Sequence, residues 1–182
     1  MTDRIRLFAI IKEHSFRRGH FVLASGQTSN YYLDLKPTMF HPEGADLTAK
    51  MIFARIRDLD VDYVGGLEMG AVPLVATVAA ASQQGGQPMF GFFVRKAVKD
   101  HGTKRRIEAA GDMKDKRVVI LEDVTTTGGS AMEAVRVVQQ EGAHVVLVLS
   151  VVDRQQGAGA SYAEQNIPFD ALFTANEFLA AM

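Results

Sequence analysis

Two adjacent acids, Glu122 and Asp123, follow an apolar run and precede a loop rich in hydroxyls and glycines. Carboxylates accept hydrogen bonds from sugar hydroxyls but repel a phosphate, whereas hydroxyls and closely approaching backbone amides suit a phosphate. The loop residues that offer such groups are Val124, Thr125, Thr126, Thr127, Gly128, Gly129 and Ser130. We therefore interpret this motif as a site for a sugar phosphate; the alternative is an ordinary polar connection between a strand and a helix.

Ser130 and Glu133 have the spacing of a capping box, in which a serine hydroxyl and a glutamate carboxylate satisfy free amides at a helix start. The loop is thus predicted to open onto a helix N-terminus, whose free N–H groups and dipole favour an anion. Neither a Gly-Lys-Ser/Thr sequence nor a GxGxxG fingerprint occurs in this loop. The motif is therefore neither a Walker loop nor a dinucleotide-binding turn.

A second concentration of charge lies between Arg95 and Arg106, where the chain carries six Lys or Arg, one Asp and His101. Residues 97–113 show little apolar periodicity, so we expect a long, mobile basic loop over about residues 95–112. Arginine and lysine on such a loop suit pyrophosphate, a leaving group whose developing charge must be neutralised. The alternative is a solvated charged loop with weak affinity for nucleic acid.

Arg154 follows another apolar run, and its guanidinium could hold a planar carboxylate in bidentate fashion or pair with Asp153 at the surface. Tyr31 and Tyr32 could form an aromatic wall for a flat base, although aromatic residues on strands more often belong to the core. These residues are therefore candidates for base recognition.

The remaining sequence predicts the elements that position these groups. An opening helix capped by Asp3 ends near the Arg17-Arg18-Gly19 turn, and a hairpin pairs residues 21–24 with 31–35. Further helices are expected at residues 44–59, 71–83 and 131–141, and strands at 61–65, 89–94, 118–121 and 145–152. This alternation favours a parallel sheet covered on both faces, with ligands beyond the carboxyl ends of its strands. Glu122, Asp123 and a Gly65-Gly66 turn are expected to meet there.

Composition limits the class of protein. A chain of 182 residues with 47% hydrophobic and 23% charged residues predicts one globular domain. The net charge of −1 argues against nucleic acid as a partner, and the absence of cysteine excludes disulfides and thiol catalysis and fits a cytoplasmic location. We find no signal peptide and no apolar stretch near the roughly 20 residues that span a bilayer, so no membrane partner is expected. The histidines show no metal-ligand spacing, so no protein metal site is expected.

An apolar strand, two acids and a Thr/Gly-rich turn resemble the phosphoribosyl-pyrophosphate (PRPP) signature of type I phosphoribosyltransferases. Within that group, the chain is similar to the orotate phosphoribosyltransferases over nearly its whole length. The segments that carry this similarity are residues 21–34, 95–102, 152–155 and 168–173. The resemblance implies a type I phosphoribosyltransferase-like α/β fold, with a mostly parallel sheet flanked by helices and a small N-terminal hood containing the hairpin. Residues 1–182 would form one domain, with the hood mainly in 1–40 and the core in 41–182.

The resemblance also implies a reaction, the transfer of ribose 5-phosphate from PRPP to orotate with release of pyrophosphate. Asp123, Lys99 and His101 would be catalytic, and Thr126 and Arg154 would bind orotate. The residues implied to bind PRPP are Arg95, Lys96, Lys99, His101 and all of Glu122 to Ser130, with a pyrophosphate loop at residues 65–71. Mg²⁺ would arrive with PRPP, and a homodimer would let the basic loop of one subunit act in the site of the other.

Two positions depart from the family pattern. Ala24 stands where many members carry a lysine that reaches PRPP and orotate, and Met69-Gly70 stand where some relatives have a lysine. Lys36, in the same hairpin region as Ala24, could compensate. Two other functions stay open: a phosphoribosyltransferase for a purine base, which should lack the Arg154 carboxylate reader, and a non-enzymatic PRPP-sensing regulator that binds nucleic acid through the basic loop.

Overall fold

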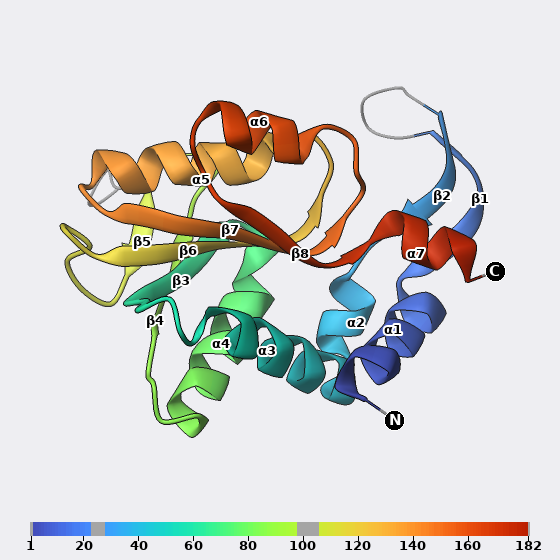
Figure 1. Cartoon of the computed structure of the whole chain (residues 1–182), viewed down its shortest axis with the longest axis horizontal. Coiled ribbons are helices and arrows are strands. Elements are labelled where there is room, and N and C mark those ends of the chain that lie inside the picture. The colour runs from blue at the N-terminus through green and yellow to red at the C-terminus, as the bar shows by residue number, and fades with distance from the viewer. Residues whose placement is uncertain (1, 23–27, 98–105, 182) are drawn as a thin grey trace.

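The computed structural model describes residues 2–22, 28–97 and 106–181. Its main sheet has six strands in the order β5-β4-β3-β6-β7-β8, and only β5 runs antiparallel to its neighbour (Figure 1). The strands are β3 (Tyr63–Leu67), β4 (Phe90–Val94), β5 (Ile107–Ala109), β6 (Arg117–Thr125), β7 (His144–Asp153) and β8 (Phe169–Thr174). The prediction of a mostly parallel sheet is confirmed.

The apolar sequence of β6 explains why both faces of the sheet are covered. Side chains of a strand alternate between faces, and Val118 and Ile120 join one buried cluster while Val119 and Leu121 join the other. Helices α5 (Gly129–Gln140) and α6 (Ala158–Glu164) cover the first face, and α3 (Pro42–Ile56) and α4 (Ala71–Gln84) cover the second (Figure 1). The central strands are thus held between two hydrophobic cores.

The N-terminal hood contains the predicted hairpin as a separate antiparallel pair, β1 (Phe16–Val22) and β2 (Thr28–Leu33), at one end of the molecule (Figure 1). Around its base lie α1 (Asp3–His14), α2 (Lys36–Phe40) and the C-terminal α7 (Ala175–Ala180). Three details of the prediction are wrong. Residues 31–33 pair with residues 16–18, and Phe21 pairs with Ser29, so the hairpin has another register than the predicted pairing of 21–24 with 31–35. The side chain of Thr2, not Asp3, caps α1, and Arg17 to Gly19 belong to β1 because the strand begins directly after the helix.

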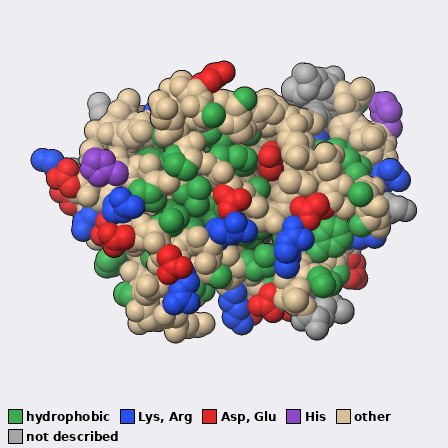
Figure 2. All heavy atoms as spheres, viewed as in Figure 1, with side chains coloured by type: hydrophobic (Ala, Val, Ile, Leu, Met, Phe, Trp, Pro, Cys, Tyr) green, Lys and Arg blue, Asp and Glu red, His purple; other side chains and the backbone are tan. Residues whose placement is uncertain are grey.

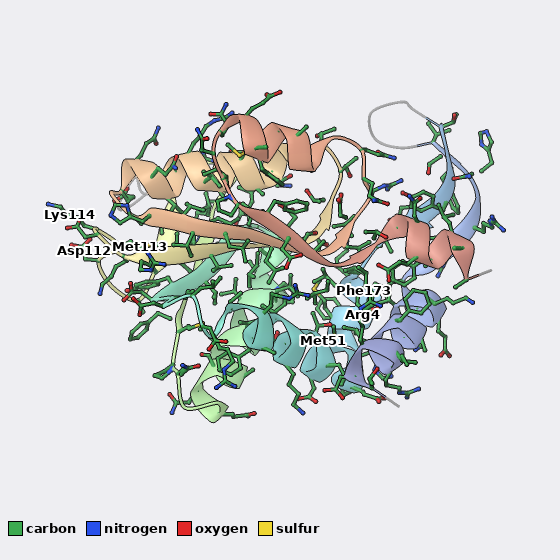
Figure 3. The ribbon with its side chains drawn as sticks, in the orientation of Figure 1. Arg4, Met51, Asp112, Met113, Lys114 and Phe173 are labelled. Atoms are coloured by element: carbon green, nitrogen blue, oxygen red, sulfur yellow. The ribbon has the colours of Figure 1, made fainter. Side chains whose placement is uncertain are left out.

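The two ends of the chain pack against each other. The Arg4 guanidinium lies 4.6 Å from the centroid of the Phe173 ring (Figure 3), and Arg4 Nη2 donates to Glu177 at 2.5 Å. Phe8 of α1 stacks on Phe178 of α7 with ring centroids 4.4 Å apart. These contacts fix the helices beneath the hood to the last strand of the sheet.

Basic and acidic side chains are interspersed on the face shown in Figure 2. Many of them form ion pairs between elements, such as Arg55 of α3 with Asp170 of β8 at 2.7 Å. Among the described residues, no helix combines the length and apolarity that crossing a membrane requires.

Several predicted boundaries are wrong, and at three of them a neighbouring strand extends the pairing. β6 continues along β7 as far as the Thr125–Asp153 pair, so Glu122 and Asp123 lie within the strand and not after it. Gly66 likewise lies within β3, paired with Phe93 of β4. Helix α3 covers residues 42–56 and not 44–59. Residues 107–109, predicted as loop, form β5 against β4.

Candidate active site

The candidate site lies where β3 and β6 end. The chain continues from β3 to β4 on one side and from β6 to β7 on the other, so the two central strands form a topological switch point, where ligands of α/β proteins commonly bind. A cavity of about 380 Å³ opens there. Its lining comprises Lys36, Leu67, Glu68, Met69, Gly70, Lys96, Glu122, Asp123, Val124 and Ser130.

A second hollow of about 200 Å³ is lined by Glu122 and by Val124 to Ser130. The two hollows share Glu122, Val124 and Ser130, so they adjoin. The whole predicted motif therefore faces one composite site, with the acids between its two parts.

Two glycines, Gly66 of β3 and Gly70 of the turn that follows it, let this part of the chain lie directly against β6. A Cβ atom at Gly66 would stand 2.3 Å from the Leu121 carbonyl oxygen, and one at Gly70 would stand 2.7 Å from Asp123 Oδ1. Both distances are shorter than any real Cβ contact, so a side chain at either position would push the turn away from the acids. The peptide bond between Glu68 and Met69 in this turn is cis.

The environment of the two acids favours a bound proton. Burial raises the pKa of Glu122 to about 8, the charge of Asp123 adds to this rise, and Lys96 opposes it. Burial also raises the pKa of Asp123, against a hydrogen bond of 2.8 Å from the Val124 amide to Oδ1 and the charge of Lys36. At neutral pH the pair therefore carries less than two negative charges, and a cation or hydroxyl donors in the cavity would favour release of its proton.

Tyr162 of α6 shapes the loop that follows β6. Its hydroxyl lies 3.0 Å from Thr125 Oγ1, and its ring lies 2.8 Å from where a Cβ of Gly128 would be. Gly128 has a φ of +86°, a conformation that glycine adopts without strain. Thr125 is buried and its hydroxyl bonds to Tyr162, so this residue anchors the start of the loop to α6. No sequence pattern singled out Tyr162, because only the folded chain brings α6 to this loop.

The predicted capping box at Ser130 is wrong. Helix α5 begins at Gly129 with Gly128 as N-cap and has no side-chain cap, which places Ser130 inside the first turn. The Glu133 carboxylate instead pairs with the Arg106 guanidinium. A capping box does occur at the start of α7, between Thr174 and Glu177.

The basic residues divide between the cavity and its surroundings. Lys96 lines the cavity, whereas Arg95 Nε bonds to Glu108 at 3.0 Å and its guanidinium lies over the Phe93 ring. Lys36 also lines the cavity, and its Nζ pairs with Asp34 Oδ1 at 2.7 Å. The predicted catalytic residues Lys99 and His101, and the departure at Ala24, lie outside the described residues.

Arg154 connects the end of β7 to the hood. Its guanidinium lies 4.4 Å from the centroid of Tyr31, and Nη2 donates to Ser29 Oγ at 3.3 Å. Its Nε is buried and has no hydrogen-bond partner within residues 2–22, 28–97 and 106–181. The Arg154 guanidinium thus contacts Tyr31 and Ser29, while Asp153 Oδ1 accepts a bond from the Gln155 amide at 2.7 Å, so the predicted alternative of an Asp153–Arg154 pair is wrong. Tyr31 is 5% exposed and belongs to the core, while Tyr32 is 42% exposed.

Comparisons with known proteins show the family to which the chain belongs. Residues 40–176 match the model of the phosphoribosyl transferase domain, which defines the chain as a phosphoribosyltransferase of the type its fold suggested. The orotate phosphoribosyltransferase of Bradyrhizobium diazoefficiens is 51% identical, covering 99% of this chain and 98% of the relative. That of Rhodopseudomonas palustris strain BisB5 is 52% identical, covering 98% and 97%. The chain belongs to the orotate phosphoribosyltransferase family.

Solved structures support the same assignment. The Mycobacterium tuberculosis orotate phosphoribosyltransferase in complex with PRPP superimposes with a TM-score of 0.82 at 30% identity, covering 97% of this chain and 99% of that one. An adenine phosphoribosyltransferase from Rhodothermus marinus reaches a TM-score of 0.65 at 18% identity, covering 93% and 99%, which shows a shared fold alone.

Proposed function

We propose that the composite site binds PRPP and orotate, and that orotate N1 displaces pyrophosphate from C1 of PRPP to give orotidine 5′-monophosphate. The observation that carries this proposal is the position of Glu122 and Asp123 at the switch point, between a hydroxyl-lined hollow and a cavity that contains two lysines. Family membership at about half identity over nearly the whole chain supports orotate as the base.

The smaller hollow suits the 5′-phosphate. Thr126, Thr127 and Ser130 offer hydroxyls there, and Gly128 and Gly129 bring backbone amides of the α5 N-terminus close. Glu122 and Asp123 are placed to accept hydrogen bonds from the ribose hydroxyls. The larger cavity, with the 68–70 turn and Lys96, suits the pyrophosphate, and Lys99 and His101 are proposed to join it there.

Catalysis rests on position and charge. As the bond from C1 to pyrophosphate breaks, positive charge grows on the ribose and negative charge on the leaving group, and fixed cations stabilise the latter. Asp123 holds the ribose hydroxyls and thereby orients C1 towards the base. The proton on N1 of orotate leaves as the bond from N1 to C1 forms, and water or the departing pyrophosphate can accept it, so we assign no general base in the protein.

Magnesium is proposed to enter with PRPP. Within the described part of the chain no three His, Asp or Glu side chains are grouped to hold a metal. The two carboxylates beside the cavity fit an ion that keeps most of its ligands from phosphate and water, as Mg²⁺ does. The ion would neutralise pyrophosphate charge when bound.

Arg154 is proposed to recognise orotate, with Thr126 beside it. A guanidinium presents parallel donors that match a carboxylate, and the Nε donor of Arg154 has no partner among the residues that the structure describes. A purine base lacks the carboxylate that such a residue would read. The cysteine-free composition is consistent with action in the reducing cytoplasm.

The experiment mixes the purified protein with Mg²⁺, PRPP and orotate and follows the loss of orotate absorbance, with adenine and hypoxanthine in parallel. Of the three bases, only orotate should be consumed.

The variant Asp123→Asn should lower kcat/KM for orotate about 100-fold, which corresponds to a loss of roughly 2.7 kcal/mol of transition-state stabilisation. The control Asp58→Asn, at a side chain that is 89% exposed, should leave kcat/KM unchanged. Consumption of adenine or hypoxanthine would instead support a phosphoribosyltransferase for a purine base. Binding of PRPP without turnover of any base would support a non-enzymatic PRPP-sensing regulator.

A further inference from the structure

Glu133 begins a chain of contacts that ends at the candidate active site. Its carboxylate projects from α5 and forms an ion pair with Nη2 of Arg106, a side chain that is 27% exposed. Arg106 stands at the start of the segment leading into β5, so the pair joins α5 to the far edge of the main sheet.

The Arg106 guanidinium is turned back towards the backbone that leaves β4. Nε and Nη2 donate to the Arg95 carbonyl at 3.0 and 2.8 Å, and Nη2 also donates to the Lys96 carbonyl at 3.3 Å. The Arg95 amide in turn donates to the Arg106 carbonyl at 2.8 Å. Arg106 therefore clamps the two residues that follow β4.

Lys96 is held from its other side as well. Its amide donates to Glu68 Oε1 at 2.9 Å, and Glu68 belongs to the turn that lines the cavity. With its amide bonded to that turn and its carbonyl bonded to Arg106, the backbone of Lys96 is fixed next to the acids. Its ammonium group interacts electrostatically with Glu122.

We propose that Arg106 and Glu133 are positioning residues that hold Lys96 in the cavity, where its ammonium group binds the pyrophosphate of PRPP. Glu133 orients the guanidinium, because the ion pair adds a charged partner to the carbonyl bonds and so opposes the rotamer entropy of a long arginine side chain. The oriented guanidinium of Arg106 then fixes the backbone of Lys96 through its hydrogen bonds to the Arg95 and Lys96 carbonyls. The inference rests on the proposed function of the cavity and adds two residues that do not line it.

If the ion pair between Arg106 and Glu133 only stabilises the fold, the expected effect of removing it differs from that of a positioning role. If the pair only fastened α5 to the edge of the sheet, its loss would lower the melting temperature and leave PRPP affinity dependent on Lys96 as before. If it acts through Lys96, its loss lowers PRPP affinity only while Lys96 is present.

The experiment measures PRPP binding by calorimetry with Mg²⁺ for Glu133→Gln, Lys96→Ala and the double variant. Glu133→Gln should raise the Kd about tenfold, since a charged contact to the ligand is misplaced, and should add less than about twofold in the Lys96→Ala background. Glu43→Gln is the matched control, because Glu43 is 42% exposed in a pair with Arg6 while Glu133 is 40% exposed. It should bind PRPP as the wild type does.

Arg106→Lys is the second variant, to be used if Glu133→Gln does not fold. It keeps a positive charge beside Glu133 but lacks the forked donors, so it should raise the Kd in the same way. Wild-type affinity in the folded variants, or an equal loss with and without Lys96, would overturn the inference. If the wild type binds PRPP but does not convert orotate, only the proposed reaction is contradicted. If the wild type does not bind PRPP, the proposed reaction and the positioning role of Arg106 and Glu133 are both contradicted.

Discussion

Glu122 is half-buried beside another carboxylate, and its protonation links the site to the stability of the fold. Its pKa is about 8 in the folded protein against an ordinary value of 4.5. The folded state therefore holds the proton more tightly than the unfolded state, and the stability from this group is present below pH 4.5 and lost as the pH rises through 8. Since one pKa unit corresponds to about 1.4 kcal/mol, the loss has an upper bound of about 5 kcal/mol.

We expect Glu122→Gln to remove this pH dependence. The variant should gain stability relative to the wild type as the pH rises from 5 to 9, because a neutral amide needs no proton to remain buried. Urea unfolding at pH 5, 7 and 9 measures the difference, with Glu13→Gln, at a side chain 75% exposed, as control. A constant difference between variant and wild type over this range would contradict the assigned direction.

The same proton should leave when PRPP binds. Ribose hydroxyls and a magnesium ion favour the ionised carboxylate, so binding at pH 7 should release up to about one proton per site from Glu122. Calorimetry in two buffers with different ionisation enthalpies counts the protons, and Glu122→Gln corrects for protons released by PRPP itself. Equal release from wild type and variant would show that Glu122 does not take part.

At the scale of elements, the loop between β6 and α5 depends on its contact with α6. Gly128→Ala should lower the unfolding free energy by roughly 2 kcal/mol, because alanine is strained at positive φ and its Cβ would meet the Tyr162 ring. Gly129→Ala is the matched control: apart from its chain neighbours and its own helix backbone, no atom of the described residues lies within 4 Å of its added Cβ. Its unfolding free energy should change by less than about 0.5 kcal/mol. Chemical unfolding of both variants measures these free energies. Similar unfolding free energies for Gly128→Ala and Gly129→Ala would mean that α6 does not constrain the loop.

The elements were predictable where local pattern and tertiary contacts agree. The apolar runs of β6 and β7 could be recognised without knowledge of the fold, and so the sheet and the edge at which the acids lie could be predicted.

The predictions from sequence are wrong where a residue far away in the chain determines the local structure. Ser130 and Glu133 have the spacing of a capping box, but Arg106 offers Glu133 a charged partner that the local sequence does not reveal. β5 has only three residues and exists because β4 presents an open edge. The roles of Tyr162, Lys36 and Arg154 likewise depend on contacts between segments far apart in the chain.

At the scale of the whole molecule, the proposed homodimer would share its sites between subunits. If Lys99 acts in the partner's site, Asp123→Asn and Lys99→Ala subunits should complement each other in mixed dimers. Co-expression of the two inactive variants should restore about a quarter of wild-type activity, because about half the dimers are mixed and each has one intact site. Turnover of orotate by the co-purified protein measures this. No recovery in demonstrably mixed dimers would place Lys99 in its own subunit's site.

The pairing of β6 changes along its length. Its register with β3 ends at the Gly65–Ile120 pair, whereas its register with β7 continues to the Thr125–Asp153 pair. Amide hydrogens near Ile120 should therefore exchange with solvent only when the whole sheet opens, while those beyond Asp123 exchange through local fraying. The substrate site thus stands at a border between slow and fast exchange, where a bound ligand can order the strand end without any change in the core.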